Sequence, residues 1–179
     1  MLKNNTRFIK EVLDTAAGEK VIAGMADGEV MIVPEFNSGV PPKKQKKFNM
    51  TLFPTNYRIV VYEAKDWFLS KDRFDQLPYT QLQSINFECF VDEDKKGKNR
   101  KVVCIVDFIV PDESIYPTIS FKMDIDDMMT FDSFRALVAA ISKHASEVNG
   151  KAISIKDYTD YKELKKSKLL IENADVAKK

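Results

Sequence analysis

The sequence predicts a mainly β domain: a small β-barrel of about seven antiparallel strands, capped at one end by a C-terminal amphipathic helix. Two observations predict the sheet and the helix. Short β-like segments recur at close intervals with hairpin-length connections, and the apolar spacing changes to a helical period after residue 130. The chain has 179 residues, 44% of them apolar, which is enough for a real hydrophobic core.

The strand predictions rest on alternating apolar residues and on β-branched and aromatic side chains. In residues 48–53, Phe48, Met50 and Leu52 share one face and Asn49 and Thr51 the other. Tight turns are predicted at 54–56 and in the polar run 92–101. The sequence therefore predicts strands within 20–36 (one or two), 48–53, 57–63, 77–79, 82–90, 102–110 and 118–123.

The C-terminal helix is predicted over residues 130–148 from a stripe of apolar residues three and four apart. Asp126 and Asp127 place negative charge at its start, Thr130 can cap it, and Asn149-Gly150 ends it. We expect the stripe to plug the open end of the barrel; its members are Phe131, Phe134, Val138, Ile141, Ala145 and Val148.

Three parts of the chain are distinguished by pattern. Residues 1–17 are predicted as an N-terminal helical extension, with a short helix over 5–17 that stops at Gly18. Residues 18–150 form the expected domain. Residues 151–179 are a lysine-rich tail in which 160–173 could be helical, but its apolar residues make a poor stripe. We expect this tail to be loosely attached or ordered by a partner.

The composition excludes several classes of protein. A net charge of +1 gives no support to a nucleic-acid binder, so no nucleic-acid partner is expected. No stretch reaches the roughly 18 apolar residues of a membrane span. Cys89 and Cys104 could form a disulfide, but their apolar strand-like surroundings favour reduced core residues. We expect a cytoplasmic protein whose membrane contact, if any, is peripheral.

The central segment resembles the pleckstrin-homology-like superfamily, and within it the GRAM-type domain. The residues that carry the resemblance are Thr55-Asn56-Tyr57-Arg58, the apolar strand that follows, and the segment from Leu77-Pro78-Tyr79 to Ser84-Ile85. Gly18-Glu19 resembles the Gly-Glu that precedes the first strand in many members. The resemblance spans roughly residues 18–148 and implies the barrel with its late helix. These motif residues have mostly structural meanings, and Arg58 is expected to pair with a carboxylate or a carbonyl.

A basic loop is the first candidate binding site. In pleckstrin-homology domains the corresponding loop often holds an inositol phosphate, because clustered ammonium groups offset phosphate charge. The family's continuation of a basic residue, one spacer and an arginine is absent after Lys47. Each lysine near an anionic membrane contributes about 1 kcal/mol, so a modest, salt-sensitive attraction is expected. The alternative is a solvated loop. The candidate residues are Lys43, Lys44, Lys46, Lys47, Arg58 and Lys65.

Trp67 and Phe68 form the second candidate site, for a protein partner or a membrane interface, with packing against the barrel edge as the alternative. The chain has one histidine, which leaves little scope for a histidine-dependent catalytic unit. Neither metal-ligand spacing nor a nucleotide fingerprint occurs. We therefore expect neither catalytic residues, nor a metal site, nor a cofactor.

The expected function is that of a non-catalytic adaptor acting through protein–protein contacts, with weak anionic-lipid contact as a second role. The alternative is a phosphoinositide-binding module that recruits the chain to membranes through the Lys43–Lys47 loop. A small-molecule carrier using the barrel interior and an enzyme are less favoured. Side chains should fill the interior of so small a barrel.

Overall fold

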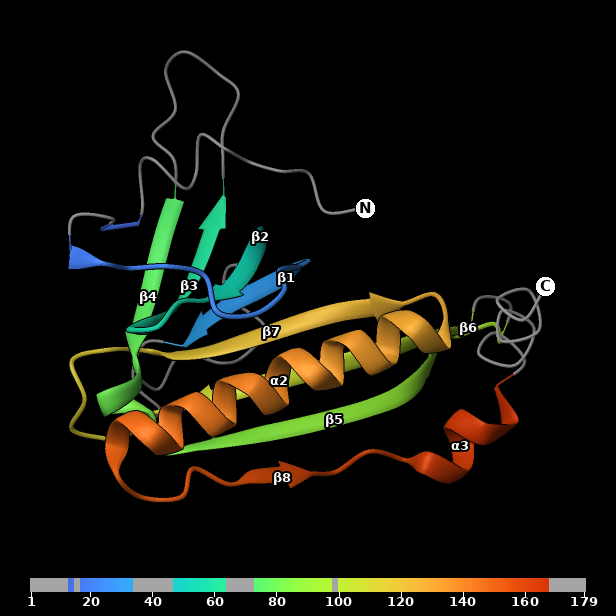
Figure 1. Ribbon diagram of the computed structural model, residues 1–179. Coiled ribbons are helices and arrows are strands. Elements are labelled where there is room, and N and C mark those ends of the chain that lie inside the picture. Colours follow the sequence, from blue (N-terminus) through green and yellow to red (C-terminus); the bar gives the residue numbers. More distant parts are fainter. Residues whose placement is uncertain (1–12, 15–16, 34–46, 64–72, 98–99, 168–179) are drawn as a thin grey trace, which may run out of the picture.

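The fold is a single eight-stranded sheet with one long helix across it, as seen in a computed structural model (Figure 1). The structure describes residues 13–14, 17–33, 47–63, 73–97 and 100–167. The strand order is β4-β3-β2-β1-β7-β6-β5-β8. The strands are β1 (Ala26–Val33), β2 (Lys47–Pro54), β3 (Arg58–Glu63), β4 (Arg73–Pro78), β5 (Ser84–Glu93), β6 (Arg100–Ile109), β7 (Thr118–Ile125) and β8 (Ile155–Asp157). The helices are η3 (Tyr79–Gln81), α2 (Met128–Asn149) and α3 (Tyr161–Lys166).

The mainly β prediction is confirmed, but the sheet is not closed and has eight strands where about seven were expected. Neighbouring strands run antiparallel, except that β8 runs parallel to β5. Its edges are β4 and β8. The chain leaves β4 through η3, and Pro78 at the end of this edge strand has no backbone N–H to donate to a further strand.

The sheet bends so that its two halves face different ways. In Figure 1, β2, β3 and β4 cross steeply over the line of β5, β6 and β7, and α2 lies along the face of the latter three strands. Gly28 on β1 lies where the halves join: a Cβ there would stand 2.3 Å from the backbone oxygen of Lys122 on β7. The close approach of β1 to β7 therefore requires glycine at this position.

The predicted C-terminal helix is present as α2. The Asp127 carboxylate accepts a hydrogen bond from the Thr130 backbone N–H at 2.6 Å, and Gly150 ends the helix in the left-handed conformation at φ 63°. Five of the six predicted stripe residues are buried, but Val148 is 44% exposed. Leu137 is buried as well. The helix covers the main core, which contains the inward residues of most strands.

A second, smaller hydrophobic cluster lies on the other face of β2 and β3. Phe53, Val60 and Tyr62 are buried there with Leu13, while their neighbours Leu52 and Val61 belong to the main core. Both faces of these strands are therefore apolar and covered. Of the predicted helix 5–17, residues 5–12 and 15–16 lie outside the described part. Leu13 and Asp14 are not helical.

The expected loose attachment of the tail from residue 151 is corrected for residues 151–167. The Ile85 N–H donates to the Ser154 carbonyl at 3.1 Å, and the Tyr158 N–H donates to the Phe87 carbonyl at 2.7 Å. Ile153 and Leu164 are buried in the main core. The prediction was wrong because it looked for a regular helical stripe of apolar residues. The segment is attached instead by backbone hydrogen bonds to β5 and by two separate buried side chains, Ile153 and Leu164. The helix in it is only Tyr161–Lys166.

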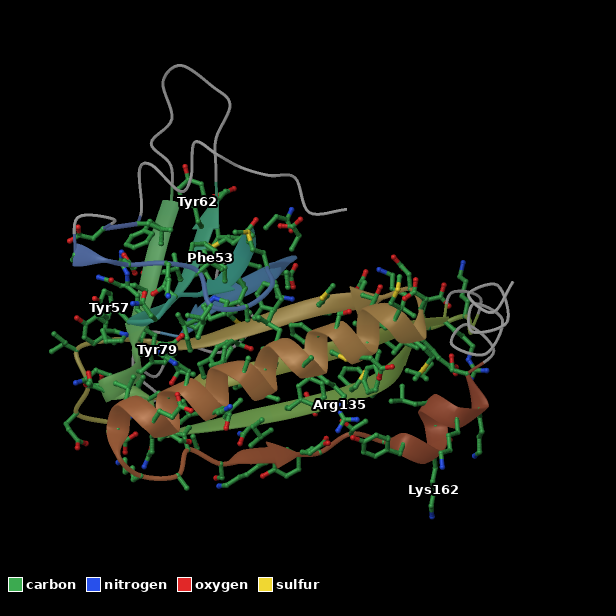
Figure 2. The ribbon with its side chains drawn as sticks, viewed as in Figure 1. Phe53, Tyr57, Tyr62, Tyr79, Arg135 and Lys162 are labelled. Carbon is green, nitrogen blue, oxygen red and sulfur yellow. The ribbon has the colours of Figure 1, made fainter. Side chains whose placement is uncertain are left out.

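Replacing Leu164 with alanine is expected to lower the free energy of unfolding by about 2–5 kcal/mol, because the side chain is 5% exposed and leaves a cavity in the core. Equilibrium urea unfolding measures this. The control is Lys162→Ala on the same helix, where the side chain is exposed and points away from the body (Figure 2). Equal stability of the two variants would show that residues 151–167 do not support the fold.

Candidate functional site

The two parts of the family-like signature meet in one buried ion pair. The Arg58 guanidinium donates to both carboxylate oxygens of Glu19, at 2.8 Å and 2.9 Å, and also to the side chain of Gln76. The Glu19 side chain is 1% exposed and that of Arg58 18% exposed. The Thr55 hydroxyl donates to the same carboxylate at 2.8 Å. A carboxylate with this many donors is fully paired and can be buried without a large cost.

The same contacts explain the acidity of Glu19. Burial pushes the pKa of this carboxyl upward, but the hydrogen bonds from Arg58, from the Asp14 backbone N–H and from Thr55 outweigh it. The net result is a pKa below the usual value of 4.5. Glu19 is therefore ionised at neutral pH, as its pairing with a guanidinium requires.

The Thr55-Asn56 turn connects this ion pair to helix α2. The Tyr79 hydroxyl donates to the Thr55 carbonyl at 2.7 Å, and a ring nitrogen of His144 lies 2.8 Å from the Asn56 carbonyl. The Asn149 amide donates to the Tyr79 carbonyl at 2.6 Å. Figure 2 shows Tyr79 beside the C-terminal part of α2. One network thus connects the segment before β1, the β2–β3 turn, η3 and the end of α2.

This network is structural. The prediction that Arg58 pairs with a carboxylate is confirmed. The Asn56 side chain accepts from the Lys20 N–H and donates to the Gly18 carbonyl, so it fixes the segment before β1 against the turn. The hydrogen bonds of the buried Glu19 carboxylate and Thr55 hydroxyl join Arg58 and the surrounding backbone.

The candidate anionic site lies largely outside the described residues. This applies to Lys43, Lys44, Lys46 and Lys65, and also to the candidate contact residues Trp67 and Phe68. Lys47 begins β2, and its ammonium lies 3.1 Å from the Glu29 carboxylate with both side chains exposed. Arg58 is held by Glu19. The anionic-site hypothesis then depends on the lysines alone.

The described strand ends that flank residues 34–46 and residues 64–72 lie at one end of the sheet. Met31 pairs with Lys47 near the end of β1 and the start of β2, and Glu63 pairs with Arg73 at the end of β3 and the start of β4. Since β2 and β3 are antiparallel, the start of β2 and the end of β3 lie at the same end. Arg58 begins β3 and therefore lies at the opposite end of that strand from Glu63.

The two cysteines face one another across β5 and β6. Cys89 and Cys104 are register partners, both fully buried and both free thiols, which agrees with the expectation of reduced core residues. A hydrogen bond with Cys89, together with burial, raises the pKa of the Cys104 thiol far above its usual value. Thiolate is the reactive form, so the Cys104 thiol should be inert in the folded chain, and burial shields both thiols from reagents.

Both thiols are expected to stay unmodified by a disulfide reagent such as dithionitrobenzoate at neutral pH, and to react once denaturant unfolds the chain. Burial excludes the reagent from both thiols, and the raised pKa of Cys104 keeps that thiol protonated. Absorbance of the released thiolate measures the reaction. Rapid release before unfolding would contradict this account of the pair.

A groove of about 920 Å³ lies beside the N-terminal half of α2. Three segments form it: residues 23–27 before and at the start of β1, the end of β7 with residue 126, and residues 129–137 of α2. Phe134 and Leu137 form part of its floor and also belong to the core. Sequence reasoning missed this groove because each segment supplies only a few residues.

Methionines and aspartates give the groove its chemistry. Met25, Met123 and Met129 line it, and Met129 is 70% exposed. Methionine side chains are flexible and polarisable, so such a surface adapts to different apolar partners. The charged residues among its described lining are all acidic, namely Asp27, Asp124 and Asp126.

Two searches concern the described residues alone. Among them, no group of three or more histidine, cysteine or acidic side chains is placed to hold a metal ion. No helix in the described ranges has the length and apolar character needed to cross a membrane.

No protein-family model matches the chain, and no curated protein matches it. Solved structures give distant likenesses. The hSac2 domain from the human phosphoinositide phosphatase Sac2 has a TM-score of 0.46 and 14% identity over 87% of this chain and 91% of that one. A Vav1 structure with an allosteric inhibitor has a TM-score of 0.36 and 11% identity over 74% of this chain and 30% of that one. Both likenesses are too distant to assign an activity to this chain.

Proposed function

We propose that this chain is a non-catalytic adaptor of the pleckstrin-homology/GRAM-like type, which binds a protein partner in the groove beside α2. The observation that carries the proposal is the groove itself, with a volume of about 920 Å³ and an apolar floor. Met129 stands 70% exposed at its edge. A surface hollow with an apolar floor and a few polar groups is typical of an interaction site.

The signature network supports the family-like part of the proposal. Gly18-Glu19 and Thr55-Asn56-Tyr57-Arg58 were singled out as a resemblance, and these two segments are joined by hydrogen bonds between residues 38 and 39 positions apart in the sequence. Their role is to hold the first strands and α2 together. A rigid body of this kind can present a groove whose walls come from distant segments.

Co-purification tests the proposal, with a matched pair of substitutions on α2. Ala136 lines the groove, whereas Ala139 is exposed on the same helix and does not line it. We expect Ala136→Arg to lose the proteins that travel with the tagged chain from its own cells, and Ala139→Arg to keep them. Urea unfolding of both variants checks that each remains folded. Identical co-purifying proteins for the two variants would overturn the proposal.

A phosphoinositide-binding role is the second candidate. It is favoured by the strand register, because the described strand ends that flank residues 34–46 and 64–72 lie at one end of the sheet. These two stretches of the sequence carry Lys43, Lys44, Lys46, Lys65 and Trp67. Sedimentation with phosphoinositide vesicles is the test, comparing the wild type with a variant in which all four lysines of the 43–47 loop are glutamine. Equal sedimentation would remove the loop from consideration.

A further inference from the structure

The geometry points to a specific class of partner for the groove: an amphipathic segment with apolar side chains on one face and lysine or arginine at its margins. This inference rests on the proposed function, since it names the occupant of the same groove. It depends on two features of the described lining, the methionine-rich floor and the sign of the charges at the rim.

The floor accepts apolar side chains. Met25 and Met123 are only partly buried, and Phe134 and Leu137 close the bottom of the groove. Placing leucine-like or aromatic side chains over these atoms would remove both apolar surfaces from water, at roughly 25 cal/mol for each square ångström. A partner needs an apolar face to gain from this.

The rim selects positive charge. Asp124 is paired with Lys101 at 2.9 Å, so that carboxylate is partly compensated. Asp27 accepts a hydrogen bond from the neutral Thr51 hydroxyl at 2.5 Å, which leaves its negative charge in place. Asp126 is exposed beside them. The described lining includes three aspartates and neither lysine nor arginine, so a basic segment would meet opposite charge there and an acidic segment like charge.

The acidic rim of the groove also determines which apolar segments it accepts. An apolar floor alone would accept many hydrophobic segments, because methionine adapts its shape. A rim of one sign disfavours acidic competitors and orients the accepted segment, since like charges brought together across an interface are costly. Binding of the expected segment should therefore weaken with added salt, which screens exposed charges.

Fluorescence anisotropy with three labelled peptides tests the inference. The first is an amphipathic helical peptide with leucine and phenylalanine on one face and lysine on the other. The second has glutamate in place of lysine, and the third has serine in place of the apolar residues. We expect the full-length chain to bind the first peptide and to bind the other two at least roughly tenfold more weakly, with salt reducing the difference between the first and second.

Charge variants give the matched comparison. Asp27→Asn with Asp126→Asn should weaken the first peptide by roughly two- to fivefold for each charge removed. Asp132→Asn, an exposed acid of α2 outside the groove, should leave its affinity unchanged. Asparagine keeps an oxygen that can accept from Thr51, so the fold should persist, and urea unfolding checks this.

The failures are distinguishable. If the chain binds the lysine and glutamate peptides equally, and Ala136→Arg abolishes the binding of both, the basic-partner inference is overturned but the groove remains a docking surface. If the chain binds none of the peptides, but Ala136→Arg still loses the co-purifying proteins, the basic-partner inference is overturned and the proposed function stands. If the chain binds none of the peptides and Ala136→Arg keeps the same co-purifying proteins as Ala139→Arg, the proposed function is overturned as well. Self-association abolished by Ala136→Arg would identify a second copy as the occupant and overturn the inference.

Discussion

Replacing Arg58 with methionine is expected to lower the free energy of unfolding by about 3–5 kcal/mol, one of the two largest effects of any single change considered. The substitution leaves the Glu19 carboxylate buried without its main charged partner, and removes a guanidinium that also lies 5.4 Å from the centre of the Phe74 ring. Chemical denaturation measures the loss.

The control for Arg58→Met is Arg135→Met. Arg135 is half-exposed and lies 3.9 Å from the Asp157 carboxylate, so its ion pair is screened by water. Such surface pairs contribute about 0–1 kcal/mol. A double variant, Glu19→Gln with Arg58→Met, should lose less stability than Arg58→Met alone, because no buried charge remains. Equal losses for the two arginine variants would contradict the structural role of the Glu19–Arg58 pair.

The cost of Arg58→Met should also depend on pH. In the wild type the pKa of Glu19 is lowered in the folded state, so its contribution is present above the ordinary value of 4.5 and is lost as the pH falls through the lowered value. Without the guanidinium, burial dominates and raises the pKa of Glu19, so protonation stabilises the variant. The stability difference between wild type and variant is therefore expected to shrink on acidification. A constant difference between pH 7 and pH 4 would be inconsistent with this pairing.

Replacing Phe134 with alanine is expected to lower the free energy of unfolding by a similar amount, about 3–5 kcal/mol. This ring is 2% exposed, and its centroid lies 6.0 Å from that of Phe87 on β5 and 5.9 Å from that of Phe121 on β7. Its removal leaves a cavity where α2 covers the sheet.

Lys143→Ala is the matched control for Phe134→Ala, since Lys143 is exposed on the same helix. Its effect should stay within about 0.5 kcal/mol. Thermal and urea unfolding measure the stability of the two variants. Phe134→Ala reports the packing of α2 against the sheet, whereas Lys143→Ala reports a substitution in the same helix without core contacts. A small loss for Phe134→Ala would mean that α2 does not seal the core.

Local patterns in the sequence were sufficient for α2 and for most strands. The stripe from Phe131 to Ala145 has a regular spacing and a cap, and the resulting helix begins at Met128 within two residues of the expected start. Alternation in residues 48–53 likewise predicted which side of β2 faces the main core. These features succeed because each is decided within one element.

Features that join distant segments could not be predicted in the same way. The Gly-Glu and Thr-Asn-x-Arg segments were recognised separately, but nothing local showed that Glu19 and Arg58 bind one another. Strand β8 has only three residues, too few for alternation, and is defined by its parallel pairing with β5. The second cluster around Phe53 was missed because it joins β2 and β3 to Leu13, a residue of a distant segment.

Methyl-labelled methionine NMR, with the lysine-bearing amphipathic peptide added to the full-length chain, tests the central claim most directly. The chain has seven methionines, so individual signals can be assigned by substitution. The account predicts that the methyl signals of Met25, Met123 and Met129 shift with peptide concentration, while that of Met50, 3% exposed in the core, stays in place. Saturable binding that leaves the three groove methionines unshifted would contradict it.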